Sequence, residues 1–311
     1  MVFVGKIAYL LLFPGMLFVL LAGLAARAVL AGVGTAVAGR ERRGAGAGTG
    51  FLFSAPRSEC IATDGSLHAV TWIAPVVKIL ALSWVSCLVF GFIRGDLVLL
   101  FALLLLASGA DVVVAFTSGN PRVRQSAWPE AASLGAWAVP LGLVVATVSL
   151  RTGDPTLTGL IKWQSTNGAL VAARGGAAAQ AGTVLALVAA LAAALALARL
   201  RPLGRGYLSD APGGLLDDVS GPPLAFFIAG ETVGLFVIPL VLVALFFAGP
   251  AAHPYEIIFW GLKVLGVFVL LALVDVVSAR ARSRSALIWG AGAAGAIALA
   301  GLVLTWIGVS A

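Results

Sequence analysis

The sequence predicts an all-α integral membrane protein, with about eight transmembrane helices in a single polytopic domain covering residues 1–311. The composition is the first reason: 61% of the residues are hydrophobic, only 11% are charged, and the mean hydropathy is +1.07. Soluble globular domains carry about 25% charged residues, so this chain lies far outside their range. The second reason is that apolar runs of roughly 20 residues, long enough to cross a bilayer, follow one another along the chain.

The expected spans are about 7–32, 69–92, 96–117, 130–150, 179–199, 224–248, 256–278 and 286–308. The first begins too close to Met1, and runs too long, for a cleavable signal peptide, so we expect it to remain as a helix. The fifth is nearly all Ala, Leu and Val, which is typical of a helix that packs closely on its neighbours. The polar stretches 39–68, 151–178 and 200–223 are too short to form a soluble domain.

The distribution of positive charge predicts that the N-terminus lies outside. With that orientation the inner loops 39–68, 118–129, 200–223 and 279–285 carry eleven Lys and Arg residues, against five in the outer segments. Positive residues favour the cytoplasmic side of a membrane. The net charge of +7 is therefore a topology signal, and no nucleic-acid partner is expected. The high alanine and glycine content points to a prokaryotic source, which places the chain in the cell (inner) membrane as a multi-pass protein.

Few residues are suited to metal binding or nucleophilic catalysis. The only cysteines are Cys60 and Cys87, and the only histidines are His68 and His253. Their spacing fits no zinc, haem or cluster site. No nucleophile–histidine arrangement is visible either. We therefore expect no catalytic residue, no metal ligand and no cofactor-binding residue in this chain, and any redox cofactor should belong to another subunit.

Seven ionisable residues lie within or at the edge of the apolar stretches, and they are the main functional signal. They are Arg27, Lys78, Asp111, Glu130, Glu231, Lys263 and Asp275. A charge in hydrocarbon costs at least about 2.5 kcal/mol, so such residues usually face a protein interior or a wet cavity. Because both signs are present, the pattern predicts ion pairs between helices and a path for protons or ions.

Particular pairs can be anticipated from the spans. Lys78 lies near the middle of the second span, where Asp111 or Glu130 would supply a carboxylate partner. Lys263 and Asp275 are twelve residues apart, about 18 Å along a helix, so they cannot pair with each other. Glu231 is the expected partner of Lys263, and Arg280 that of Asp275. Arg27 is expected to extend toward the nearby inner interface.

Several short motifs resemble the membrane subunit that joins the membrane arm to the redox arm in respiratory complex I (NADH dehydrogenase). The resemblance is closer to the equivalent subunit of formate hydrogenlyase and the other group 4 membrane-bound NiFe hydrogenases. It rests on four stretches: Leu262–Val267 followed by Asp275–Arg282, Ser118–Pro121 leading to Pro129–Ala131, Asp218–Gly221 before the apolar run to Glu231, and Arg42–Gly44. The resemblance extends over most of the 311 residues and over the eight predicted spans.

The resemblance implies a membrane anchoring and proton-coupling subunit of an oxidoreductase complex, with the redox chemistry in its partners. The implied proton relay comprises Glu130, Glu231, Lys263, Lys78 and Asp111. Docking of an iron–sulfur redox module would use Arg42, Arg43, Arg201, Arg205 and Asp218, while Asp275 and Arg280 form a structural ion pair. The implied partners are hydrogenase-like large and small subunits, which hold the iron–sulfur clusters and, in hydrogenases, the NiFe centre, together with antiporter-like membrane subunits and the lipid bilayer.

Departures from the family pattern leave two alternatives open. The family's acid-rich loop between spans five and six is replaced here by Arg201–Asp210, which contains arginine and glycine, and the Gly-Pro-Asn-Arg motif of quinone-using relatives is missing. Quinone use is therefore not expected. The first alternative is a structural anchor of such a complex that does not pump. The second is an autonomous secondary transporter, although no internal repeat of the kind seen in transporters is visible.

Overall fold

The computed structural model describes residues 10–12, 14–38, 65–118, 121–173, 176–200, 202–203, 222–247, 254–278 and 290–310, with only the backbone at 31–38, 65–68, 122, 126, 222 and 254–257. In these residues the helices are α2 (Met16–Ala38), α4 (Gly65–Val89), α5 (Leu97–Thr117), α6 (Pro121–Thr152), α7 (Leu157–Asn167), α8 (Ala177–Leu197), α10 (Pro222–Phe246), α11 (Pro254–Val277) and α13 (Gly292–Ser310). The described part of the chain contains no β-strand, apart from an isolated bridge between Asp96 and Thr156.

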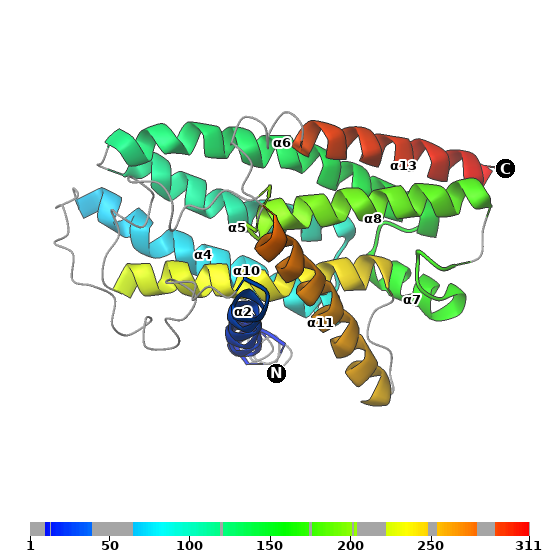
Figure 1. Cartoon of the computed structure of the whole chain (residues 1–311), viewed down its shortest axis with the longest axis horizontal. Coiled ribbons are helices and arrows are strands. Elements are labelled where there is room, and N and C mark those ends of the chain that lie inside the picture. The colour runs from blue at the N-terminus through cyan, green and yellow to red at the C-terminus, as the bar shows by residue number, and fades with distance from the viewer. Residues whose placement is uncertain are drawn as a thin grey trace.

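The helices confirm the predicted all-α membrane fold. Seven of them, α4, α5, α6, α8, α10, α11 and α13, are long and apolar enough to cross a bilayer. The apolar part of α2 that the structure describes is shorter, Met16–Leu30. Consecutive spans run in opposite directions: α4, α6 and α10 begin at the left-hand end of the bundle, where α5 finishes, and α8 runs toward that end but stops near the middle (Figure 1). We call this left-hand end the charged-loop end; its placement in the cytoplasm stays a prediction.

One helix begins well before its expected boundary, and one further helix was not expected. Helix α6 begins at Pro121 instead of near residue 130, and it continues through Pro129. Pro121 fits the first helical position because the N–H that proline lacks would have no intrahelical partner there. Helix α7 was not expected at all; it begins at an N-cap, Thr156, whose hydroxyl accepts a hydrogen bond from Gly159 N. Hydropathy marks only the lipid-crossing part of a helix, so it misses a polar extension or a short helix at the interface.

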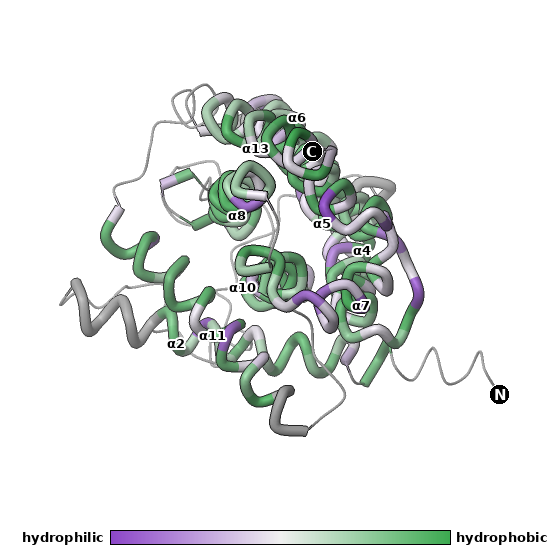
Figure 2. The backbone as a smooth tube through the Cα atoms, turned by 90° about the vertical axis from the view of Figure 1, so that its right-hand side faces the viewer, coloured by the Kyte–Doolittle hydropathy of each residue, from purple (hydrophilic) through white to green (hydrophobic). Residues whose placement is uncertain are grey.

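Helix α10 lies at the centre of the molecule, with the other helices around it (Figure 2). Its apolar residues point in every direction, and the four consecutive residues Val243–Phe246 are all buried. A helix that is hydrophobic all round is typically buried on all sides. Any charge on α10 is therefore surrounded largely by protein, and Glu231 is the acid that this helix carries among its apolar residues.

Helices α2 and α11 cross the bundle instead of following it. In Figure 1 the helices α4, α6, α8 and α10 run along the long axis, whereas α2 is seen almost end-on and α11 runs diagonally. The chain bends at Pro14 just before α2, and Ser86 Oγ on α4 donates a hydrogen bond of 2.8 Å to the Pro14 carbonyl. A neighbouring helix thus satisfies the carbonyl at the bend, as lipid-embedded backbone requires.

Helices α8 and α13 pack with their backbones in close contact. A Cβ atom added at Gly301 would lie 2.8 Å from Gly182 O, and one added at Gly182 would lie 2.5 Å from Gly301 O. Neither helix has room for a larger residue here. Small residues that allow close backbone approach are a common basis of helix packing in membranes, so the alanine-rich helix packs closely on its neighbour, as its sequence predicted.

Replacing Gly301 by valine should therefore separate α8 from α13 and lower the free energy of unfolding by about 1–3 kcal/mol, the usual cost of overpacking. The measurement is the thermal melting of the tagged chain in mild detergent. Gly295→Val is the matched control, because it is on the same helix and a Cβ there meets nothing within 4 Å. Equal melting temperatures for the two variants would contradict the tight contact.

Candidate functional site

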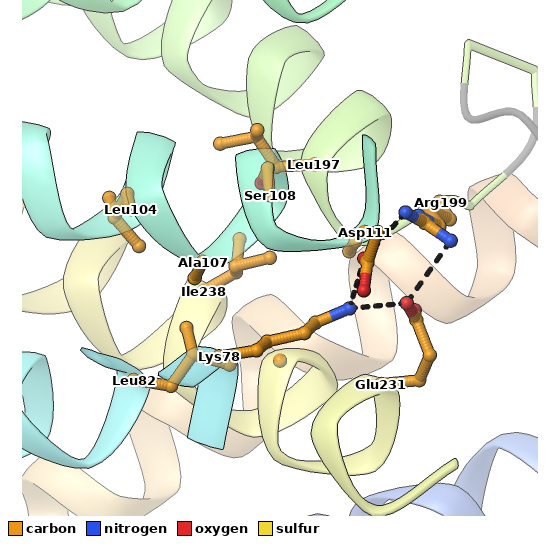
Figure 3. A pocket seen from close by; sticks show the side chains of 12 residues that line it. Lys78, Leu82, Leu104, Ala107, Ser108, Asp111, Leu197, Arg199, Glu231 and Ile238 are labelled. Atoms are coloured by element: carbon orange, nitrogen blue, oxygen red, sulfur yellow. Dashed lines mark hydrogen bonds and ion pairs between the residues drawn. The ribbon is translucent and has the colours of Figure 1, made fainter. Parts of the chain in front are cut away.

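Four charged side chains from four parts of the chain form a closed ring inside the bundle, which we call the charge ring (Figure 3). Lys78 Nζ on α4 lies 2.6 Å from Asp111 Oδ2 on α5 and 2.5 Å from Glu231 Oε1 on α10. Arg199, which follows α8, lies 2.7 Å from Asp111 Oδ2 and 3.2 Å from Glu231 Oε1. Each cation thus contacts both carboxylates, and the formal charges of the ring sum to zero.

The ring is shielded from the surroundings. The side chains of Asp111 and Lys78 are only 1% and 7% exposed, and those of Arg199 and Glu231 only 15% and 17%. Charges this deep are retained only where partners compensate the loss of hydration. Removing one member of a buried pair typically costs about 3–5 kcal/mol, because the other charge is left uncompensated. The ring therefore holds α4, α5, α8 and α10 together at one depth of the bundle.

Arg199 reaches the ring through an unusual backbone conformation. Helix α8 ends in hydrogen bonds from Arg199 N to Ala196 O and from Leu200 N to Leu195 O. This is the Schellman pattern, whose left-handed residue is usually glycine. Here it is Arg199, with φ of +56°. A left-handed non-glycine residue costs on the order of 1–3 kcal/mol, so the ion pairs of this arginine help to offset strain in its own backbone.

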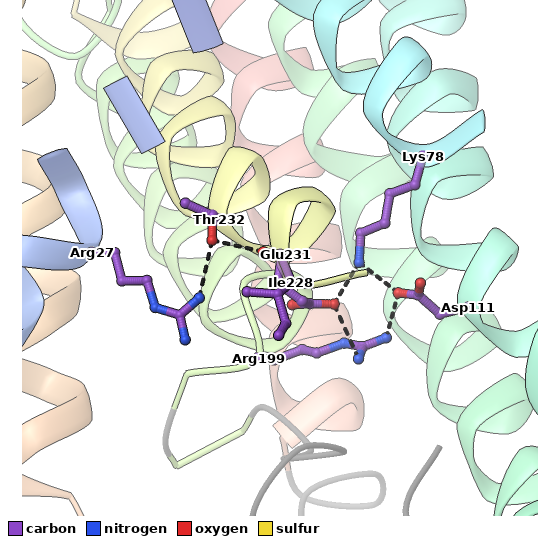
Figure 4. Close-up of polar contacts among 7 residues, drawn as sticks. All are labelled: Arg27, Lys78, Asp111, Arg199, Ile228, Glu231 and Thr232. Atoms are coloured by element: carbon purple, nitrogen blue, oxygen red, sulfur yellow. Dashed lines mark hydrogen bonds and ion pairs between the residues drawn. The ribbon is translucent and has the colours of Figure 1, made fainter. Parts of the chain in front are cut away.

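A third cation, Arg27, approaches from α2 (Figure 4). Its Nη1 lies 3.1 Å from Thr232 Oγ1, next to Glu231 in the chain. The crossing of α2 over α10 depends on Gly23, since a Cβ atom there would lie 2.3 Å from Thr232 O. The expectation that Arg27 extends toward the interface is therefore wrong: the helix crossing turns it inward, one helical turn from Gly23, toward the charge ring.

Two small cavities whose walls contain charged and polar side chains lie next to the ring. One, of about 20 Å³, is lined by the four ring residues and by Ser108. The other, of about 40 Å³, is lined by Glu130, Ser133 and Trp137 and also by Ser108 and Arg199. We call them the ring cavity and the Glu130 cavity. A water molecule needs about 10–15 Å³ of such space, so each cavity has room for at least one. The expected pairing of Lys78 with Asp111 is present, whereas Glu130 lines the neighbouring cavity.

A third cavity, of about 30 Å³, is lined entirely by apolar side chains of α5, α6, α8 and α10. It shares Leu104, Leu197 and Ile238 with the ring cavity and extends to Leu100 and Leu245, away from the charged-loop end. Empty apolar cavities in proteins stay dry. Polar space thus lies beside the ring at Glu130, and apolar space lies on its other side.

Lys263 is separated from the ring, and its predicted contact with Glu231 is not formed. Its Nζ donates a hydrogen bond of 2.9 Å to Phe247 O, at the end of α10. Phe247 is sixteen residues after Glu231, which corresponds to roughly 24 Å along the helix. An exposed lysine that binds the last carbonyls of a helix interacts favourably with its dipole. Helix order along the chain indicated that α10 and α11 are neighbours, but not the level at which they meet.

The other predicted site residues are placed as follows. Asp275 on α11 is buried, 3% exposed, while its expected partner Arg280 lies outside the described residues. The predicted docking residues also lie outside them, namely Arg42, Arg43, Arg201, Arg205 and Asp218. Among the residues that the structure describes, no three His, Cys, Asp or Glu side chains come together in a way that could hold a metal ion.

Arg199 is the one ring member that the sequence analysis did not select. It stands at the boundary of the fifth predicted span, where an arginine normally reaches into the loop. The sequence does indicate that Arg199 is close to the membrane interior, because the run 177–198 is apolar apart from Gln180 and Thr183 and ends directly at this arginine. What the sequence does not show is the left-handed turn that directs the side chain toward the interior.

The fold and the ring define a polytopic helical membrane protein with a charged interior, as opposed to an apolar anchor. The comparisons name the family: the model described as NADH dehydrogenase matches residues 55–306. The chain belongs to this family, that of the complex I membrane subunit, and is a membrane subunit of a complex I-like respiratory complex. The comparison with curated protein sequences gave no match.

One solved structure shows the same fold over nearly the whole chain. It is a chain of the membrane-bound sulfane sulfur reductase, an archaeal respiratory membrane complex. The match has a TM-score of 0.75 and covers 93% of this chain and 96% of that chain, at 19% sequence identity. Identity this low establishes a common fold and leaves the reaction and partners of the present chain to be inferred.

The ring predicts strong coupling between Lys78 and Asp111. Asp111→Asn leaves two cations facing one carboxylate, and Lys78→Met leaves two carboxylates facing one cation, so each should lower the free energy of unfolding by about 3–5 kcal/mol. The double variant keeps one cation and one anion, Arg199 and Glu231, and should recover much of this loss. Thermal melting in detergent measures the cycle. Additive losses would contradict the ring, and Arg94→Gln, at an exposed site, is the control.

The crossing of α2 over α10 predicts that Gly23→Val displaces Arg27. The added side chain would collide with the α10 backbone at Thr232, so the melting temperature should fall at least as far as in Arg27→Gln. The double variant should lose little more than Gly23→Val, because Arg27 has already been moved away. Ala25→Val, on the exposed face of the same helix, should melt like the parent. Full additivity of the two losses would show that Arg27 and the crossing are independent.

Proposed function

We propose that this chain anchors the redox subunits of its complex to the membrane and passes protons through the charge ring. The observation that carries the proposal is a ring of two cations and two carboxylates buried in the bundle, with polar cavities beside it. Ionisable residues within membrane segments generally mark ion pathways or proton relays. The partners would be an iron–sulfur protein pair of hydrogenase type and antiporter-like membrane subunits, as the resemblance of the sequence motifs implies.

In this mechanism the ring works by shifting its charge balance. Lys78 contacts both carboxylates, so it stabilises whichever one is ionised. When a proton reaches Glu231, the negative charge there disappears, and Lys78 and Arg199 then interact mainly with Asp111. Interactions between charges are strong where water is scarce, so a proton or a redox event near one end of the ring alters the proton affinity of the other. Arg27 adds a third positive charge on the α2 side of Glu231.

The position of the ring indicates the side from which protons would enter. Glu231 lies nine residues after the start of α10 and fifteen before its end, or roughly 14 Å and 22 Å along the helix axis. The ring is thus nearer the charged-loop end, and the Glu130 cavity adjoins it. The apolar cavity lies on the opposite side. A proton would therefore enter from the charged-loop end and leave sideways, toward neighbouring membrane subunits.

Docking of the redox subunits would involve the charged-loop end. The polar segments 39–68 and 200–223 adjoin this end, and they carry Arg42, Arg43, Arg201, Arg205 and Asp218. The second segment begins directly after Arg199 in the chain. A subunit bound to this segment would contact residues that are next to a ring member in the chain. This supports a coupling between redox chemistry and proton transfer.

The alternative is a structural anchor without proton transfer. It is favoured by one observation: every member of the ring is paired, so the ring is also well suited to fixing the helices permanently. The acid-poor loop Arg201–Asp210 agrees with this alternative. The family assignment speaks against an autonomous transporter, since it makes the chain one subunit of a larger complex.

The first experiment is mass spectrometry of the native complex that copurifies with the tagged chain in mild detergent. Iron–sulfur and antiporter-like proteins among its subunits are the expected result. Their identity would indicate which electron donor and acceptor to supply in a coupling assay. Purification as a single chain or a homo-oligomer would contradict both the anchor and the relay.

Coupling is then tested with Glu231→Gln in proteoliposomes containing the whole complex. Loss of a proton-transferring carboxyl typically lowers the rate about 100-fold or more, so proton translocation per electron should fall below about a tenth of the parent value. Electron transfer should continue. Asp275→Asn is the matched control, a buried acid outside the ring, and it should keep its coupling. If Glu231→Gln assembles and pumps normally, the chain is an anchor.

A further inference from the structure

The two polar cavities meet at one hydroxyl group. Three residues line both of them: Leu197, Arg199 and Ser108. Leu197 has no group that can carry a proton, and an arginine side chain keeps its proton in proteins. A serine hydroxyl both donates and accepts hydrogen bonds. Ser108 lies one helical turn before Asp111 on α5, so the two side chains are on the same face of the helix.

Each cavity is also bordered by a residue with an unused polar atom. Asp111 lines the ring cavity, and its Oδ1 is buried with no hydrogen-bond partner among the described residues. Trp137 lines the Glu130 cavity, is 2% exposed, and has an indole N–H that likewise lacks a partner in the described chain. Buried polar atoms are nearly always satisfied by protein or by ordered water. One atom needs a donor and the other an acceptor, and water is both.

We infer that both cavities hold ordered water and that Ser108 joins the two water sites into one proton path from Glu130 to Asp111. Water in the Glu130 cavity accepts a hydrogen bond from the Trp137 indole, and water in the ring cavity donates to Asp111 Oδ1. This inference deepens the proposed function and depends on it.

The transfer conserves protons at each step. Ser108 accepts a proton from water on the Glu130 side while its own proton passes to water on the ring side, and rotation of the hydroxyl restores the starting state. The guanidinium of Arg199 borders the same passage but cannot exchange its proton. Its positive charge disfavours a hydronium ion that rests between the cavities. The hydroxyl therefore determines whether the two waters are connected, which makes Ser108 a relay residue of the proposed path.

The test uses two variants of the same shape, Ser108→Thr and Ser108→Val, in the complete complex in proteoliposomes. They differ only in the hydroxyl group, so steric effects cancel in the comparison. We expect Ser108→Thr to keep most of the proton translocation per electron and Ser108→Val to lose about tenfold or more. Both should assemble and transfer electrons. Equal coupling in the two variants, whether high or low, would overturn the role of the hydroxyl.

Water itself is probed by cryo-electron microscopy of the parent complex at a resolution that shows ordered solvent. Density for water is expected in both cavities, within hydrogen-bond distance of Asp111 Oδ1 and of the Trp137 indole nitrogen. Empty cavities would overturn the inference.

Glu231→Gln, measured in parallel, distinguishes a failure of the Ser108 path from a failure of the proposed function. If it abolishes coupling while Ser108→Val has no effect, only the role of Ser108 is wrong. If Glu231→Gln itself pumps normally, the proposed function fails, and the path through Ser108 fails with it.

Discussion

A charge inside a membrane bundle must find its partners there, and the rest of this structure follows from that requirement. Lys78, Asp111, Arg199 and Glu231 come from separate elements, and each contacts two others across distances of 2.5–3.2 Å. Such short contacts fix the depth of four helices relative to one another. Apolar packing alone tolerates sliding between helices, whereas a ring of ion pairs allows only one register. The surrounding leucine and valine side chains fill the space that this register leaves.

Two features of the backbone serve the ring. The left-handed residue that ends α8 directs Arg199 inward, and Gly23 lets α2 approach α10 closely enough for Arg27 to reach Thr232. The left-handed conformation costs free energy, and the close approach of α2 to α10 allows only glycine at position 23. The three cations and two carboxylates leave one positive charge in excess. A further acid, Glu130, lines the adjoining cavity. The polar interior thus continues from Arg27 through the ring to Glu130, and dry apolar packing borders it on the other side.

The sequence predicted the architecture well because hydropathy and length report directly on membrane crossing. It also offered Asp111 or Glu130 as the partner of Lys78, because opposite charges in nearby spans have few other partners, and the contact with Asp111 is present. It could not predict the contact of Arg199, which depends on one backbone torsion after a helix end. It placed Lys263 beside Glu231 because neighbouring helices were assumed to meet at the same height. For Arg27 the missing information was the crossing angle of α2, which no local pattern encodes.

Arg199 closes helix α8 with its backbone and the charge ring with its side chain. The last turn of the helix and the ring are therefore a single cooperative unit. If that turn unwinds, the guanidinium leaves both carboxylates, and if the ion pairs break, nothing offsets the left-handed conformation. The polar segment 200–223, which carries the proposed docking residues Arg201 and Arg205, begins directly after this joint. A force on that segment would reach the interior of the membrane through covalent bonds, without any rearrangement of helix packing.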